Sequence, residues 1–279
     1  MKKEIKEVKG VSNMIARVLT IAGSAAQGSA GIQADLKTFQ ERDVYGMAAI
    51  TAIVANNPVT SQGMFTNSLE AVEAQFYTAV KNVGVDAAKT GMLFTKEIIS
   101  LVVGLLEENQ PRSLVVDPVM IGKMGSQLLK DDAIEEMRER LFPLATVITP
   151  NLHEAERILE RGPITNKEEM KRAAQSLHRF GSDYVVVKGG ALKEEAVDIL
   201  YDGSEFIEWE QPRINTIHTS GAGCSFSAAI TAELAKGASM KEAVSTAKSY
   251  VTAAIEHALD FGKGIGSTYH AAYRISQHR

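Results

Sequence analysis

The chain has 279 residues, of which 45% are hydrophobic and 23% charged, and a formal net charge of −4. This is enough apolar material for one large domain, and the charge balance excludes the dense basic patch of nucleic-acid-binding proteins. No apolar run approaches the ~20 residues that cross a bilayer, so we expect neither nucleic-acid nor membrane partners. The single cysteine, Cys224, excludes an internal disulfide framework and a cysteine-based structural zinc site, and it indicates a reducing compartment.

The first residues, MKKEIKEVKG, mix lysines with glutamates and contain no apolar segment, so they do not have the pattern of a secretory signal. We therefore expect a mobile N-terminal extension over residues 1–15 and a cytoplasmic protein. The remainder contains no linker-like, low-complexity or repeated segment. It is expected to form a single domain over residues 16–279.

Along the chain, short apolar runs that end in turn residues predict buried strands at 18–21, 114–116, 147–148 and 185–187. The turn Asp202-Gly203 predicts a β-hairpin between residues 199–201 and 206–209. Apolar periodicity predicts helices at 30–42, 68–82, 95–108, 131–141, 152–160, 167–180, 224–236 and 240–259. This alternation predicts an α/β fold with a mostly parallel sheet covered by helices on both faces.

Ligands of such sheets bind beyond the carboxyl ends of the strands, and small or polar residues follow the first predicted strand. The loop 23–31 reads GSAAQGSAG, and its small side chains let a ligand approach the backbone closely. Asp35 follows it and could accept a hydrogen bond from a ring amine or hydroxyl group. An acidic residue that complements the dipole early in a helix explains Asp35 equally well.

A second group of polar residues follows the middle strands. Asp117 follows one strand, and Asn151 and Glu154 follow the next with a spacing that lets both face one Mg²⁺ ion or its waters. The same spacing is typical of an ordinary capping box. Lys188 ends a buried strand before two glycines, and a buried ammonium group needs a partner such as a phosphate.

The segment 219–227 reads TSGAGCSFS and places Cys224 where a Gly-x-Gly turn opens a helix. Free N–H groups and the helix dipole attract anions there and lower the pKa of a thiol, which a phosphate-handling enzyme could use. Alternatively, Cys224 is a small packing residue and the glycines only form a tight turn.

Together these segments resemble the ribokinase-like superfamily, and within it the hydroxymethylpyrimidine and phosphomethylpyrimidine kinases of thiamine synthesis and the related bacterial pyridoxal kinases. The similarity runs in order from about Val18 to Lys248. The matching segments are LTIAGSAAQGSAGIQADLKTFQERDVYGMAAITAIVANN, KTGML, VVDPVM, ATVITPNLHEAE, VVVKGG and TSGAGCSFSAAITAELAKG.

The resemblance implies a three-layer αβα sandwich, ATP and Mg²⁺ as cofactors, a small heteroaromatic alcohol as phosphoryl acceptor, and a homodimer. Carried over by position, Gly221, Ala222 and Gly223 form the anion hole for the transferring phosphoryl group. Cys224 stands where the wider superfamily has a catalytic aspartate, so the resemblance implies a catalytic role for it.

The resemblance also implies roles for the polar residues at the strand ends. Lys188, Asn151 and Thr219 correspond to contacts with the nucleotide and its phosphates. Asn151, Glu154 and Asp117 correspond to residues that hold Mg²⁺ through water. The residues that correspond to the acceptor pocket are Gly23, Asp35, Asn56 and Met92.

The chain departs from the family pattern at several positions. Ala25 stands where an aspartate usually follows Gly-Ser, and Gly28-Ser29 stands where two adjacent glycines are frequent. Asn56 replaces a glutamine one methylene longer with the same amide chemistry. The stretch 121–125 lacks the cysteine that dual pyridoxal and pyrimidine kinases typically have.

These features predict phosphorylation of 4-amino-5-hydroxymethyl-2-methylpyrimidine or of its monophosphate. The alternative is a pyridoxal or pyridoxine kinase, or a bifunctional enzyme. Because of Ala25, a catalytically idle sensor that binds a vitamin or a nucleotide is a third hypothesis.

Overall fold

The computed structural model describes residues 15–120, 129–193 and 196–277. Most of the expected N-terminal extension, and the stretch 121–125 that lacks the family cysteine, lie outside the described residues. Within the described part, no helix is both long and apolar enough to span a membrane.

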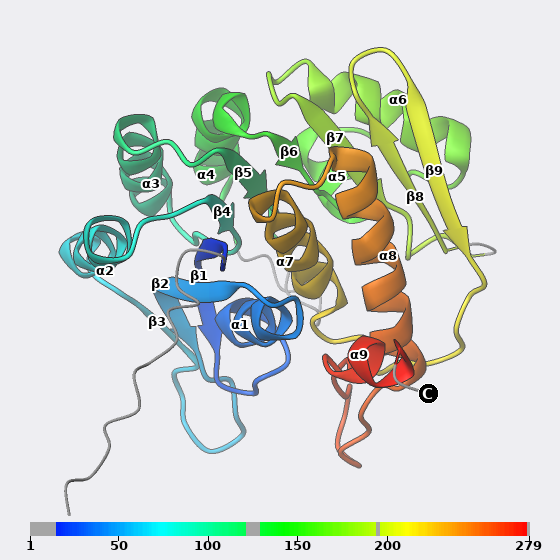
Figure 1. Ribbon diagram of the computed structural model, residues 1–279, viewed down its shortest axis with the longest axis horizontal. Helices are drawn as coiled ribbons and strands as arrows, with labels where there is room; N and C mark the ends of the chain where they lie inside the picture. Colours follow the sequence, from blue (N-terminus) through cyan, green and yellow to red (C-terminus); the bar gives the residue numbers. More distant parts are fainter. Residues whose placement is uncertain (1–14, 121–128, 194–195, 278–279) are drawn as a thin grey trace, which may run out of the picture.

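A nine-stranded sheet forms the centre of the described structure, in the order β3-β2-β1-β4-β5-β6-β7-β8-β9 (Figure 1). The pairs from β2 through β7 are parallel, whereas β3, β8 and β9 pair antiparallel at the two edges. The strands are β1 Arg17–Ala25, β2 Tyr45–Val54, β3 Met64–Thr66, β4 Ala87–Thr90, β5 Ser113–Val116, β6 Val147–Ile148, β7 Tyr184–Lys188, β8 Ala196–Tyr201 and β9 Phe206–Gln211. The prediction of a mostly parallel sheet is confirmed.

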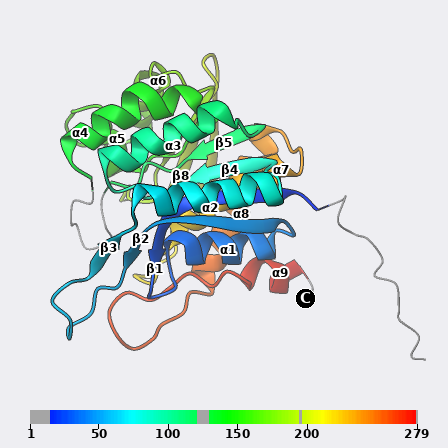
Figure 2. The ribbon, with the colours of Figure 1, turned by 90° about the vertical axis from the view of Figure 1, so that its left-hand side faces the viewer.

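Helices cover both faces of the sheet, with α2, α3 and α6 on one side and α1 on the other (Figure 2). The helices are α1 Gly31–Glu41, α2 Leu69–Asn82, α3 Lys96–Glu108, α4 Asp131–Glu136, α5 Leu152–Ile158, α6 Lys167–His178, α7 Ala222–Ala235, α8 Met240–Glu256 and α9 Ala272–Gln277. A π-helical turn, η1 Met137–Leu141, and a 3-10 turn, η2 Phe142–Leu144, continue α4. Each helix predicted from the sequence is present, and the sandwich architecture is confirmed.

Alternation along the strands explains why both faces are covered, because successive side chains point to opposite faces of a strand. In β7, Val185 and Val187 pack into the core that includes α2, α3, α5 and α6. Val186 between them packs with Phe226 of α7 and Tyr250 of α8. These strands therefore have continuous apolar sequences, as fully buried parallel strands do.

The sequence analysis did not predict β2, β3 and β4. β2 reads YGMAAITAIV and β4 reads AAKT. Glycine, alanine and lysine are poor strand formers, so local preference is weak there and pairing with β1 decides the conformation. The carboxyl ends of β1, β4, β5 and β7 point to the same end of the sheet, where the site described below is formed.

Candidate active site

A cavity of about 340 Å³ lies at the carboxyl ends of the parallel strands, beside the first turn of α7. It is lined by Ala22, Gly23, Ala25, Ala30, Gly31, Val54, Lys89, Gly91, Met92, Asp117, Val119, Asn151, Glu154, Lys188, Thr219, Ser220, Gly221, Ala222, Gly223 and Cys224. Of the residues that the resemblance assigned to a site, all except Asp35 and Asn56 line this cavity. The sheet therefore brings the phosphate, metal and acceptor candidates together.

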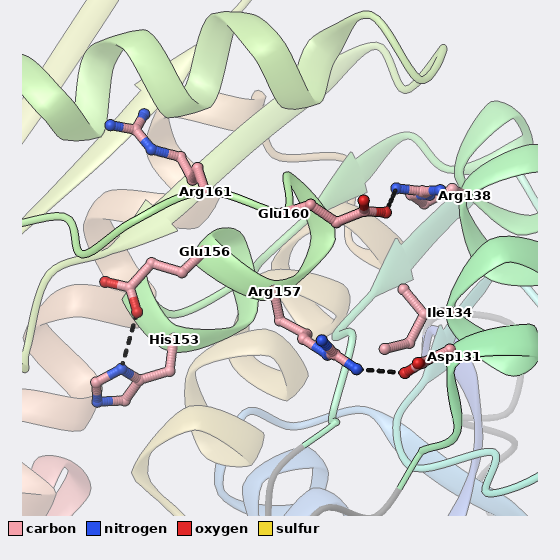
Figure 3. A pocket seen from close by; sticks show the side chains of 8 residues that line it. All are labelled: Asp131, Ile134, Arg138, His153, Glu156, Arg157, Glu160 and Arg161. Atoms are coloured by element: carbon pink, nitrogen blue, oxygen red, sulfur yellow. Dashed lines mark hydrogen bonds and ion pairs between the residues drawn. The ribbon is translucent and has the colours of Figure 1, made fainter.

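A larger hollow of about 710 Å³ lies at the surface beside α4, η1 and α5 (Figure 3). Most of its charged side chains pair with one another: Arg138 binds Glu160 at 2.9 Å, His153 lies 3.2 Å from Glu156, and Arg157 binds Asp131. No candidate residue from the sequence lines it. The smaller cavity, which gathers buried charges and a helix terminus, is the candidate active site.

The first turn of α7 forms one wall of the cavity. Gly221 precedes the helix with a φ of +86°, and a Cβ there would lie 1.7 Å from the carbonyl oxygen of Ser29. Only glycine fits such a close approach at positive φ. Within the described structure no side chain caps this turn. Its terminal N–H groups can therefore bind an anion that enters the cavity.

Lys188, at the end of β7, forms a largely buried ion pair with Asp117. Its Nζ atom lies 2.7 Å from Oδ1 of Asp117, whose carboxylate also accepts hydrogen bonds from Thr149 at 3.2 Å and Ser227 at 3.0 Å. Burial lowers the pKa of Lys188, but the charges of Asp117 and Glu154 outweigh it and hold the pKa above its usual value. Lys188 is therefore a fixed cation at the cavity wall.

The turn after Lys188 is anchored by a second buried pair. Asp198 of β8 accepts the backbone N–H of Gly189 at 3.0 Å, and its other oxygen accepts Nζ of Lys248 at 2.8 Å. Lys248, on α8, also donates to the carbonyl oxygen of Ala196 at 2.9 Å. This pair fixes the backbone that immediately follows Lys188.

Lys89, which the sequence analysis did not single out, is a second cation at the cavity. It is fully buried in β4, and its Nζ atom lies 2.9 Å from both carboxylate oxygens of Asp35. Burial lowers the pKa of Lys89, but the charges of Asp35 and Asp117 act against it and the pKa is raised. Lys89 could have been identified from the sequence by the signal that identified Lys188, which is a lysine within a buried strand, here AAKT.

Asp35 lies behind Lys89 and does not line the cavity. Besides Lys89, its carboxylate accepts a hydrogen bond of 2.6 Å from the hydroxyl group of Thr20. In this structure, Asp35 therefore orients Lys89 and has no surface open to a ligand.

Asn151 and Glu154 form the capping box of α5. The Glu154 N–H donates to Oδ1 of Asn151 at 3.0 Å, and the Asn151 N–H donates to Oε2 of Glu154 at 2.8 Å. Both residues also line the cavity, so the capping role and a ligand role are compatible. Burial raises the pKa of Glu154 to about 7, against the lowering effect of Lys188.

The donor set near Asp117 favours Mg²⁺ held through water. Among the described residues no group of three or more histidine, cysteine or acidic side chains could hold a metal ion. The oxygens of Asp117, Asn151 and Glu154 already accept hydrogen bonds. Mg²⁺ keeps several waters and binds mainly to nucleotide phosphates, so this arrangement fits it.

Cys224, in the first turn of α7, does not have the acidic thiol that the helix dipole predicted. Burial raises the pKa of its thiol to about 11, and the lowering effect of Lys89 does not compensate. The expectation of a lowered pKa was wrong for the free protein, because desolvation of the thiolate outweighs the helix terminus.

Small and apolar residues form the other wall. Gly23 and Met92 are in contact range, since a Cβ at Gly23 would lie 2.4 Å from Cε of Met92. The hydroxyl group of Thr51 fixes Met92 through its carbonyl oxygen at 2.7 Å. Asn56 is exposed, in the segment between β2 and β3, with its amide beside Gly63. The structure therefore does not bring Asn56 to the cavity.

A family model described as phosphomethylpyrimidine kinase matches residues 26–269. The chain belongs to the phosphomethylpyrimidine kinase family. It is 48% identical over 265 residues to the pyridoxine kinase of Bacillus subtilis (strain 168), which covers 94% of this chain and 98% of the relative. It is 42% identical over 262 residues to the hydroxymethylpyrimidine/phosphomethylpyrimidine kinase of the same organism, over 93% of this chain and 96% of the relative.

Solved structures of the family agree with this assignment. An ADP complex of Bacillus subtilis pyridoxal kinase superposes with a TM-score of 0.89 at 47% identity, over 94% of this chain and 99% of that one. The pyridoxal kinase of Staphylococcus aureus in complex with AMP-PCP and pyridoxal gives 0.86 at 41% identity, over 93% and 95%. This chain is therefore a phosphotransferase that uses ATP with Mg²⁺, as the sequence predicted. The hypothesis of a catalytically idle sensor is not supported.

We predict that Cys224 reacts slowly with iodoacetamide at pH 7.5, because the thiolate is the nucleophile and burial holds the thiol pKa near 11. The alkylation rate, followed by mass spectrometry of the intact protein, should keep rising between pH 8 and 10. A plateau below pH 8 would show an acidic thiol and contradict this assignment.

We also predict that Lys248→Met raises the KM for MgATP, because it leaves Asp198 unpaired beside the turn that holds Lys188. Loss of one partner of a buried pair should cost about 3–5 kcal/mol of unfolding free energy. The control is Arg42→Met, which breaks the pair with Glu233 while Lys236 remains 2.9 Å from that carboxylate; the side chains of Arg42 and Glu233 are 15% and 11% exposed, against 10% and 9% for Lys248 and Asp198. Equal effects of both substitutions on the KM for MgATP would contradict this prediction and show that Lys248 acts only on stability.

Proposed function

We propose that the protein transfers the terminal phosphoryl group of MgATP to the hydroxymethyl group of 4-amino-5-hydroxymethyl-2-methylpyrimidine or to its monophosphate. One observation carries this proposal. A single cavity joins an uncapped helix N-terminus and two buried lysines to an end lined by Gly23, Ala25, Val54 and Met92. An anion site that faces a small, mostly apolar pocket suits a phosphoryl donor and a flat ring.

The phosphate end supplies positioning and charge, which are the main requirements of phosphoryl transfer. The N–H groups of Gly221, Gly223 and Cys224 would hold the oxygens of the transferring group, whereas that of Ala222 already donates to the carbonyl oxygen of Thr219 at 3.2 Å. Lys188 supplies a cation to the phosphates, and a Cβ at Gly223 would lie only 3.4 Å from its Nζ atom. Thr219 and Asn151 line the same end and would contact the nucleotide.

We place Mg²⁺ beside Asp117, Asn151 and Glu154, with water between the ion and these side chains. The ion would neutralise phosphate charge during transfer. Glu154 contributes a carboxylate whose pKa near 7 lets it gain or lose a proton at neutral pH. The Asn151 N–H, which donates to this carboxylate at 2.8 Å, favours its ionised form.

At the acceptor end, the ring would lie between Met92 and the backbone of Gly23. Cys224 lines the same cavity. Its thiol is protonated in the free protein and cannot take up a second proton, so Cys224 could act as a base only from its thiolate form, which burial disfavours and the charge of Lys89 favours. Asn56 would reach the ring only if the segment between β2 and β3 moved toward the cavity, and Asp35 acts through Lys89.

Pyridoxal or pyridoxine is the second candidate acceptor, and a bifunctional enzyme would accept both rings. The relative that is 48% identical is named a pyridoxine kinase, and a structure at 41% identity holds pyridoxal. Both candidate substrates are small aromatic rings with a hydroxymethyl group, so the same cavity suits either.

We further propose that the protein is a cytoplasmic homodimer. Ile53 and Phe65 are cross-strand neighbours at the β2–β3 edge of the sheet, and both are exposed. Exposed apolar side chains on an edge strand and on the strand beside it favour contact with a second copy. The single cysteine fits a reducing compartment.

ADP release measured in parallel with hydroxymethylpyrimidine, its monophosphate, pyridoxal and ribose tests this proposal. We expect the highest kcat/KM with the pyrimidine and none above background with ribose. Lys188→Met should weaken the use of MgATP. A preference for pyridoxal would support the second candidate, and ADP release with none of the four would overturn the proposed function.

We predict that MgATP binds more tightly as the pH rises from 6 to 8, because Glu154, with a pKa near 7, then becomes ionised and attracts the cation. Ionisation of a carboxyl whose pKa is raised by folding destabilises the free protein over the same interval, and Mg²⁺ offsets this. Calorimetric titration of the parent and of Glu154→Gln measures the effect. The titration of ATP itself is common to both proteins, so parallel pH profiles would contradict the role of Glu154.

A further inference from the structure

The cavity lies between two loops that are far apart in the sequence. Residues 23–31, the acceptor loop, line it with Gly23, Ala25, Ala30 and Gly31. Residues 219–224, the anion-hole loop, line it as well. Under the proposed function, one loop places the acceptor alcohol and the other places the phosphoryl group. Their relative position therefore sets the distance across which the phosphoryl group must move.

A buried hydrogen bond joins these two loops. The hydroxyl oxygens of Ser29 and Ser220 lie 2.9 Å apart, and the two residues are 3% and 8% exposed. Beside this bond, the carbonyl oxygen of Ser29 packs against Gly221, where a Cβ would lie 1.7 Å away. The loops therefore meet through a side-chain bond and a close backbone contact at the same place.

Each loop is also braced on its own side. The Ser220 backbone donates to Gly266 at 3.2 Å and accepts from the N–H of Thr268 at 3.1 Å and from its hydroxyl group at 3.2 Å. The anion-hole loop is therefore held by the C-terminal segment regardless of the Ser220 hydroxyl group. That hydroxyl group is left to connect with the other wall.

The acceptor loop is braced in the same way. The N–H of Gly28 donates to Ala25 at 2.8 Å, and the N–H of Ala26 donates to Val54 at 2.8 Å. The side chain of Gln33 bonds both Ser24 and the N–H of Ala25 at 2.8 Å. Removing the Ser29 hydroxyl group would leave these bonds intact and remove one connection between the walls.

We propose that Ser29 and Ser220 form a latch that sets the position of the acceptor loop relative to the anion hole. They are positioning residues, because they act through the two loops and not on the reacting atoms. The inference rests on the proposed function and adds to it a contact that positions the two loops.

The latch should affect turnover more than binding. Each substrate contacts one loop, so each loop can still bind its own ligand when the latch is broken. A misplacement of about 1 Å between reacting groups can lower a rate by up to about 100-fold. We therefore expect Ser29→Ala and Ser220→Ala to lower kcat by about ten-fold while both KM values change less than about two-fold.

The experiment compares the parent, Ser29→Ala, Ser220→Ala, the double variant and the control Ser100→Ala. Ser100 donates a 2.6 Å hydrogen bond from α3 to Glu136 of α4, between elements away from the cavity. The acceptor is whichever of hydroxymethylpyrimidine and pyridoxal the parent phosphorylates. We expect the double variant to have the kcat of the single variants and Ser100→Ala to keep the parent kcat. Multiplied kcat losses, or a loss confined to one KM, would overturn the latch.

Thermal unfolding of the same five proteins tests the latch without turnover. If the hydroxyl groups act as one pair, the fall in Tm of the double variant will be smaller than the sum of the two single falls. Additive falls would overturn the latch. If the parent phosphorylates neither alcohol, the proposed function fails, while the Tm comparison still decides whether the two hydroxyl groups act together.

Discussion

Two buried lysine–aspartate pairs flank the first turn of α7, and the geometry of the site depends on them. Lys89 with Asp35 and Lys188 with Asp117 each place an ammonium group at the cavity within 2.9 Å of a carboxylate oxygen. A buried cation without a partner is strongly unfavourable, so the aspartates are what allow two lysines to remain charged at the ends of apolar strands. The result is a fixed positive field where phosphate is expected.

The same contacts connect this field to the helix. Ser227, one turn into α7, donates to Asp117 and so fixes the helix relative to Lys188. Lys89 lies near the Cys224 thiol from the other side, where its charge opposes the effect of burial on the thiol pKa. Because both lysines come from strands of one sheet, the N-terminus of α7, the metal candidates and the phosphate contacts share one edge.

Much of the fold and site could be predicted from the sequence, because each depends on local signals. Helix periodicity and turn residues predicted the layered α/β architecture, and the Gly-x-Gly turn predicted the start of α7. The partners of buried charges are non-local: the resemblance assigned Asp35 to the acceptor pocket, and its pairing with Lys89, 54 residues away, is not visible in the local sequence. The raised pKa of Cys224 was missed for the same reason, since burial is a property of the whole fold. Asn56 was placed by resemblance, and its exposed position depends on the path of the segment between β2 and β3.

The account makes the N-terminus of α7 and Lys188 the place where the phosphoryl group is held. A crystal structure with Mg²⁺ and AMP-PCP tests this most directly. The account predicts the terminal phosphate within hydrogen-bond distance of backbone N–H groups between Gly221 and Cys224, with Lys188 on the phosphates. A terminal phosphate bound elsewhere, for example among the arginines of the surface hollow beside α5, would contradict it.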